Sequence, residues 1–180
     1  MKITKVEAAY RQAHTAIDLF FHDGDPISIH TLTATSYNLL RDLTKGKKWM
    51  IKEILPDHAK PGREKDLINL FNKYENFLKH ADRDPDESLD YETFPTEAML
   101  WDCCSAYRRL TDTSPHPMIC YNIWFKLKNP NLVTYANSDE KIHAYVSGIM
   151  VEGVSKQEFY RITCLTLAKT SAEQGAAANP

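Results

Sequence analysis

Four polar side chains gather near the end of one predicted helix. Lys73, Asn76, Lys79 and His80 precede an acidic loop. Because residues three and four apart share a helix face, Asn76, Lys79 and His80 converge, and Lys73 lies one turn earlier. An imidazole that titrates near neutrality can move a proton, and a fixed cation can stabilise charge in a transition state. This set is a candidate for binding RNA or a nucleotide, or for cleaving a phosphodiester.

His80 also has a structural interpretation. A protonated histidine is favoured at the C-terminal end of a helix by the helix dipole, and Asp82 or Asp84 could pair with it. The four residues would then be an ordinary polar face. The sequence leaves both interpretations open, and with them the question of whether the chain is an enzyme.

A second candidate group lies on an earlier predicted helix. His30, Tyr37 and Arg41 are separated by seven and four residues, so they fall near one helix face. They are candidate ligand-binding residues that would extend a polar pocket facing the His80 helix. The alternative is a hydrogen-bonded, partly buried set.

Helical periodicity dominates the elements that must position these groups. Apolar residues recur every three or four positions from Ile3 to Phe20, and Asp25-Pro26 is typical of the start of the next helix. Further helices are predicted at about Arg63–His80, around Leu100–Leu110, over the apolar segment Ile119–Leu127, and at Asp139–Met150 and Lys156–Lys169. Only 131–135 resembles a strand. The pattern predicts an all-α fold, an antiparallel helical bundle with a helical C-terminal extension.

The division of the chain follows from these elements. We expect a bundle over residues 1–94, a helical extension over 95–170 packed on it, and a small, polar, disordered tail over 171–180. Ser155 and Glu158 fit a capping box at the last helix. No apolar signal core and no run of about 20 apolar residues is present, so we expect a cytoplasmic protein with no membrane partner.

The segment 1–81 resembles HEPN domains, small helical bundles found in many prokaryotic toxins and defence proteins. The first helix, the Asp23-Gly24-Asp25-Pro26 turn and the second helix look like the family's opening. In catalytic members an Arg precedes a His by several residues, and here Lys73 and His80 would take those positions. The resemblance implies a homodimer that cleaves RNA without metal through the 2′-hydroxyl. Lys in place of Arg departs from the pattern, because Lys lacks the planar bidentate fork.

Composition narrows the function classes. The 180 residues carry a net charge of −2, which does not indicate a general nucleic-acid binder. Charge is uneven, with a net of +4 over residues 41–52 and −6 over 82–97. This asymmetry supports an alternative hypothesis, a non-catalytic interaction or dimerisation module in which the two segments form a partner surface.

Metal and cofactor signals are weak. The four cysteines form no CxxC pair, and no histidine pair has zinc-ligand spacing, so no metal site and no cofactor are predicted. The loop from Asp82 to Asp90 opens like a calcium loop, but its sixth residue is Glu87 rather than Gly and its twelfth is Thr93. Whether this loop binds a cation stays open, and the cysteines are expected to be reduced core thiols.

Overall fold

The computed structural model describes residues 1–52, 62, 64–80, 82, 85–130, 132 and 153–177. These residues contain no strand and form six α-helices: α1 (Lys5–Phe21), α2 (Pro26–Leu43), α4 (Glu64–Lys79), α5 (Phe94–Thr111), α6 (His116–Lys128) and α8 (Lys156–Ala177). The predicted all-α fold class is confirmed. The helix predicted at 139–150 and the strand-like segment 131–135 lie outside the described residues, apart from Leu132.

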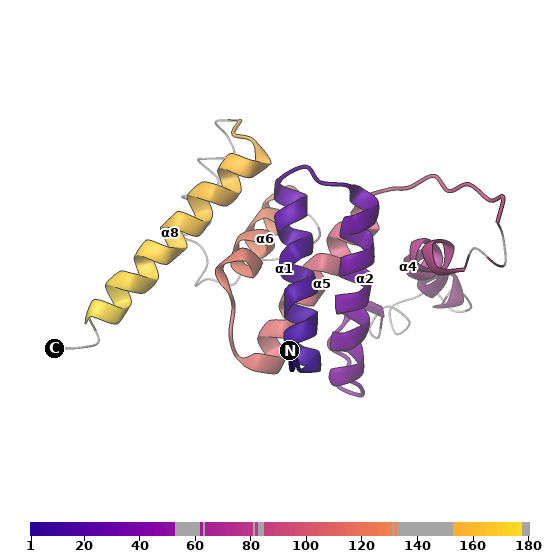
Figure 1. Cartoon of the computed structure of the whole chain (residues 1–180), viewed down its shortest axis with the longest axis horizontal. Helices are drawn as coiled ribbons and strands as arrows, with labels where there is room; N and C mark the ends of the chain where they lie inside the picture. Colours follow the sequence, from indigo (N-terminus) through magenta and orange to yellow (C-terminus); the bar gives the residue numbers. More distant parts are fainter. Residues whose placement is uncertain are drawn as a thin grey trace.

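Four helices make up the centre of the molecule. Figure 1 shows α1, α2, α5 and α6 together, with α4 beside α2 and α8 on the opposite side, where it contacts α6 and α1. No helix among the described residues is long and apolar enough to cross a membrane.

The core is continuous across residue 94, where the sequence predicts a boundary. One cluster joins aromatic residues of α1, α6 and α8, namely Phe20, Phe21, Tyr121, Trp124 and Phe159. A second cluster joins α1, α2 and α5 through Ala9, Tyr37, Leu40, Met99 and Cys103. Residues after 94 therefore complete the apolar core of the first two helices.

Local sequence explains where the first two helices begin. Thr4 precedes α1 and its hydroxyl accepts from the Glu7 amide at 3.1 Å. Asp25 precedes α2 and its carboxylate accepts from the Ser28 amide at 2.7 Å, while Pro26 occupies the first turn as predicted. Each side chain satisfies a backbone donor that has no partner within its helix.

Small residues bring α1 and α2 close together. Ser36 is buried on α2 and donates to the backbone carbonyl of Ala9 at 2.8 Å. The hydroxyls of Thr31 and Thr35 donate to carbonyls one turn earlier in their own helix, at 2.9 and 2.8 Å. Thr31, Thr35 and Ser36 therefore satisfy their hydroxyls without interrupting the helix, and Ser36 belongs to a tight helix–helix contact. The buried hydroxyl of Thr33 has no hydrogen-bond partner among the described residues.

The last helix differs from the prediction in two respects. Ser155 caps α8 by accepting from the Glu158 amide at 3.2 Å, but the Glu158 carboxylate binds Arg161, at 2.6 and 2.9 Å, so only half of the capping box is formed. The backbone of α8 also continues to Ala177, whereas the sequence predicted disorder from residue 171. Alanine, glutamate and glutamine have high helix propensity and make up five of the six residues 172–177, which accounts for the longer helix.

Candidate functional site

The four residues of the predicted phosphodiester site lie at the surface of α4 and at its C-terminal end. The side chains of Lys73, Asn76 and Lys79 are exposed, and His80 is partly exposed. The amide of His80 donates to the carbonyl of Asn76 at 3.1 Å, directly after the last helical residue. Lys79 binds the Glu75 carboxylate, and Lys73 Nζ lies 5.9 Å from the centre of the Tyr74 ring. None of the four lines either of the two pockets described below.

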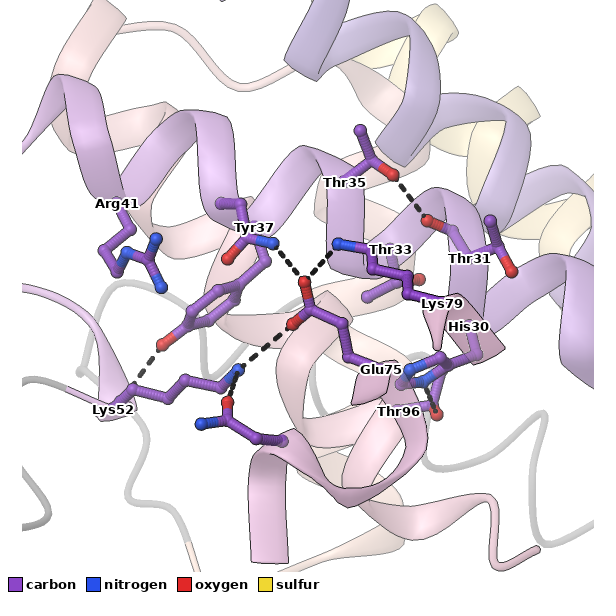
Figure 2. Close-up of polar contacts among 12 residues, drawn as sticks. His30, Thr31, Thr33, Thr35, Tyr37, Arg41, Lys52, Glu75, Lys79 and Thr96 are labelled. Carbon is purple, nitrogen blue, oxygen red and sulfur yellow. Dashed lines mark hydrogen bonds and ion pairs between the residues drawn. The ribbon is translucent and has the colours of Figure 1, made fainter. Parts of the chain in front are cut away.

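His30, Tyr37 and Arg41 share α2 but have separate environments, as Figure 2 shows. His30 and Tyr37 are buried, whereas Arg41 is partly exposed and lies 3.4 Å from Asp42 at the surface. The Tyr37 hydroxyl accepts from the Lys52 amide at 3.0 Å. Burial raises the pKa of Tyr37 far above its usual value, so this phenol is a neutral hydrogen-bonding group in the core.

Lys52 forms a buried ion pair with Glu75 of α4, and Glu75 is also hydrogen-bonded to α2 (Figure 2). Lys52 Nζ lies 3.7 Å from Glu75 Oε2, and the two side chains are only 7% and 14% exposed. Lys52 also donates to Asn72 at 2.8 Å, and Asn38 donates to Glu75 at 2.6 Å. Loss of one partner from such a buried, hydrogen-bonded pair leaves the other charge uncompensated and lowers the stability of the folded protein. The network therefore fixes α4 on α2.

The pKa values of this pair reflect two opposing effects. Burial lowers the pKa of Lys52, because it disfavours the ammonium, and the Glu75 charge partly offsets this. Burial acts to raise the pKa of Glu75, but hydrogen bonds from Lys79 and Asn38 and the Lys52 charge outweigh it, so the Glu75 pKa is lowered. Glu75 is thus a stable carboxylate.

His30 belongs to a second polar cluster, between α2 and α5. Its Nδ1 lies 2.8 Å from Thr96 Oγ1, and the Tyr91 hydroxyl lies 2.6 Å from the same oxygen. The rings of Tyr74 and Tyr91 approach the imidazole edge-on. Nε2 is buried without a hydrogen-bond partner among the described residues. Burial lowers the pKa of His30 to about 4, so the ring is neutral near pH 7.

Tyr91 and Thr96 connect this cluster to a pocket of about 250 Å³ at the α1–α2 turn. The pocket has apolar walls from Phe20, Ile29, Leu100 and Tyr121, while Asp23, Glu97, Lys156, Tyr91, Thr93 and Thr96 supply polar groups; Gly24 and Pro26 complete it. Compact sites with apolar walls and a few convergent polar groups are where small molecules bind.

The α1–α2 turn positions the acidic edge of this pocket. Asp23 adopts a left-handed conformation, with φ of 52°, and Gly24 lies so close to Leu19 that a Cβ would approach its carbonyl oxygen and side chain at 3.0 Å. Asp is among the residues that tolerate the left-handed region, and glycine avoids the clash. The pair Asp23-Gly24 therefore permits a turn tight enough to place a carboxylate beside Phe20.

A lysine ammonium from α8 already lies at this pocket. Lys156 Nζ is 3.1 Å from Asp23 Oδ1 and 4.4 Å from the centre of the Phe20 ring. Both groups attract cations. No local sequence pattern indicates this arrangement, because Lys156 is the first residue of a helix far along the chain and its partners lie on α1 and the turn that follows it.

No three His, Cys, Asp or Glu side chains in the described part of the chain lie close enough together to hold a metal ion. Part of the calcium-like loop, including Asp84, lies outside that part.

No protein-family model matches this chain, and neither a curated protein nor a solved structure is significantly similar to it. The resemblance of residues 1–94 to HEPN domains and the homodimer that it implies therefore stay predictions. The candidate site rests on the geometry alone.

Proposed function

We propose that the chain is a non-catalytic helical binding module whose pocket at the α1–α2 turn takes a small organic cation with an apolar body. The observation that carries the proposal is the Lys156 ammonium, held 3.1 Å from Asp23 and 4.4 Å from the Phe20 ring centre. A carboxylate and the face of an aromatic ring are the groups that recognise ammonium ligands. A free amine would occupy the same position and displace the lysine.

Size and charge support this ligand class. A volume of about 250 Å³ is slightly below the usual range of about 300–1,000 Å³ for drug-sized ligands, so the ligand is small. Ile29, Leu100 and Tyr121 provide an apolar wall for its body. Asp23 and Glu97 outnumber Lys156 among the charged lining residues, which favours a cation and disfavours a phosphate. The nucleotide considered from the sequence is therefore a poor match for this pocket.

Calorimetric titration of the full chain with benzylammonium, compared with benzyl alcohol, tests the proposal. We expect benzylammonium to bind with a Kd of about 0.1–1 mM, in the range usual for a ligand of so few atoms. Benzyl alcohol has nearly the same shape but no charge, so we expect it to bind at least about fivefold more weakly. Equal affinity for the two compounds, or no binding of either, would overturn the proposal.

Variants of the two acidic residues that line the pocket test where benzylammonium binds. Asp23→Asn keeps a side chain that tolerates the left-handed turn, and Glu97→Gln keeps the shape of the lining. Each should weaken benzylammonium binding by about fivefold, equivalent to about 1 kcal/mol for a partly exposed charge pair. Glu92→Gln is the matched control, because Glu92 is exposed and does not line the pocket. A loss of affinity in the control as large as in the other two variants would contradict the assignment.

RNA-directed activity is the second candidate, favoured by the exposure of Lys73, Asn76 and Lys79 along one helix with His80 at its end. If this group cleaves RNA across a homodimer interface, His80→Ala should abolish cleavage of single-stranded RNA measured without metal, because the imidazole moves the proton. His14→Ala is the control, a partly exposed histidine on α1. Cleavage unchanged in His80→Ala would rule out the group.

An interaction module remains the alternative to both. Lys45, Lys47 and Lys48 are exposed directly after α2, and Lys47 Nζ lies 4.6 Å from the centre of the Trp49 ring. This basic segment is accessible to an acidic partner, including the acidic segment of a second copy.

A further inference from the structure

The acidic edge of the pocket at the α1–α2 turn suits a primary amine. Lys156 Nζ lies 3.1 Å from Asp23 Oδ1 and 4.4 Å from the centre of the Phe20 ring. A nitrogen–oxygen separation of 3.1 Å is within the range of an N–H donor. The methyl groups of a quaternary ammonium would hold its nitrogen farther from the carboxylate, and such ligands are typically bound by aromatic cages. The turn therefore favours an ammonium that keeps its protons.

Hydroxyl groups form a second polar edge of the same pocket, at the start of α2. Tyr91 Oη lies 2.6 Å from Thr96 Oγ1 and 3.3 Å from the carbonyl oxygen of Pro26. All three residues line the pocket, so the phenol oxygen lies in its wall. Pro26 is the first residue of α2, whereas Asp23 belongs to the turn before it. The hydroxyl edge and the acidic edge are therefore separate parts of the lining.

The proton of the Tyr91 hydroxyl is already used within the protein. Two acceptors lie within its reach, the hydroxyl oxygen of Thr96 and the carbonyl oxygen of Pro26. Burial raises the pKa of Tyr91, so the hydroxyl keeps its proton near pH 7. Because that proton is donated to one of these two oxygens, the phenol oxygen offers the pocket a lone pair and not a donor.

Buried groups behind the pocket hold this acceptor in place. His30 Nδ1 lies 2.8 Å from the Thr96 oxygen, and the two side chains belong to residues that are only 1% and 3% exposed. The Tyr74 ring packs edge-on against Tyr91, with 4.8 Å between the ring centres. An acceptor that is positioned before the ligand arrives lowers the entropic cost of binding.

On the basis of the function proposed above, which places the ligand ammonium beside Asp23 and Phe20, we propose that the ligand is a primary amine with a hydroxyl group on its apolar body. Tyr91 accepts a hydrogen bond from that hydroxyl and is the residue that determines the preference for it. The net gain from one such hydrogen bond corresponds to about two- to tenfold in affinity.

Calorimetric titration of the full chain at pH 7 with meta- and para-hydroxybenzylammonium, beside benzylammonium, tests the proposal. We expect one of the two hydroxy compounds to bind about fivefold more tightly than benzylammonium. The corresponding fluoro compounds are similar in size but carry no donor, so they should show no gain. Benzyltrimethylammonium should bind at least about fivefold more weakly than benzylammonium.

The outcomes separate this proposal from the proposed function. Binding of benzylammonium without a gain from either hydroxyl would overturn the hydroxyl preference and leave the cation site standing. Equal or tighter binding of benzyltrimethylammonium would overturn the preference for a primary amine. Binding of none of the compounds would overturn both the cation site and the preference.

Tyr91→Phe tests the role of the hydroxyl. The variant keeps a ring against Tyr74 but removes the acceptor oxygen, so the preference for the hydroxy compound should be lost, while the affinity for benzylammonium should change by less than about twofold. Tyr10→Phe is the matched control, because Tyr10 is a partly exposed tyrosine of α1 that does not line the pocket. A preference that survives in Tyr91→Phe would contradict the assignment. The comparison of hydroxy and fluoro compounds on the natural chain decides the question alone if the variant does not fold.

Discussion

Replacing Glu75 with Leu is expected to lower the free energy of unfolding by about 3 kcal/mol, because it leaves the Lys52 ammonium buried without its carboxylate. Lys52 is 7% exposed and would retain only the Asn72 carbonyl as a strong partner among its contacts with α4. Asn38 would lose its acceptor at the same time. Urea unfolding of the variant beside the natural chain measures the effect.

The matched control uses the other lysine of the same network. Lys79 also binds Glu75, but its side chain is 51% exposed, so Lys79→Met should cost no more than about 0.5 kcal/mol. The double variant Lys52→Met/Glu75→Leu should recover most of the loss, because an apolar pair of similar volume carries no buried charge. If Glu75→Leu and Lys79→Met cost the same, the buried pair does not fix α4 on α2.

Acidification should destabilise the protein through His30. The unfolded chain takes up a proton near the ordinary histidine pKa of about 6.5, whereas burial lowers the pKa in the folded protein to about 4. Between these values the unfolded state binds more protons, so the free energy of unfolding falls as the pH falls. We expect a loss of about 2 kcal/mol from this residue between pH 7.5 and pH 5.

Urea unfolding of the natural chain and His30→Gln over this pH range measures the contribution. Gln keeps a group able to hydrogen-bond Thr96 but does not titrate, so the variant should show a flatter dependence of stability on pH. Keeping the pH above 5 separates His30 from carboxylates such as Asp25 and Glu158, whose pKa values are lowered. We expect the free energy of unfolding of His14→Ala to depend on pH as steeply as that of the natural chain. Only His30→Gln should show a flatter dependence. If His30→Gln keeps the full slope, His30 is not the buried neutral group.

Sequence alone predicted the features that depend on neighbours along the chain. The all-α class follows from helical periodicity, and the start of α2 follows from Asp25 and Pro26, which act within one turn. Ser155 was correctly identified as a cap for the same reason. The predicted end of α8 was wrong. A tail of small and polar residues suggested disorder, whereas the same residues are compatible with a helix.

The sites could not be predicted because their partners are far apart in sequence. Thr96 lies 66 residues from His30, and Glu75 belongs to a different helix from Asn38. The sequence placed His30, Tyr37 and Arg41 on one face, but α4 and α5 bury the first two and leave Arg41 at the surface. Lys156 and Asp23 meet only because α8 packs beside α1, which no local pattern indicates.

The most direct test of the binding pocket is the affinity of Lys156→Met for benzylammonium, measured by calorimetry beside the natural chain. Lys156 now holds the position of the ligand ammonium, so removing its charge should strengthen binding by about fivefold, the equivalent of about 1 kcal/mol. Lys169→Met, an exposed change on the same helix, should leave the affinity unchanged. Unchanged or weaker binding in Lys156→Met would contradict the account, because Lys156 would then be a structural tether and not a competitor for the pocket.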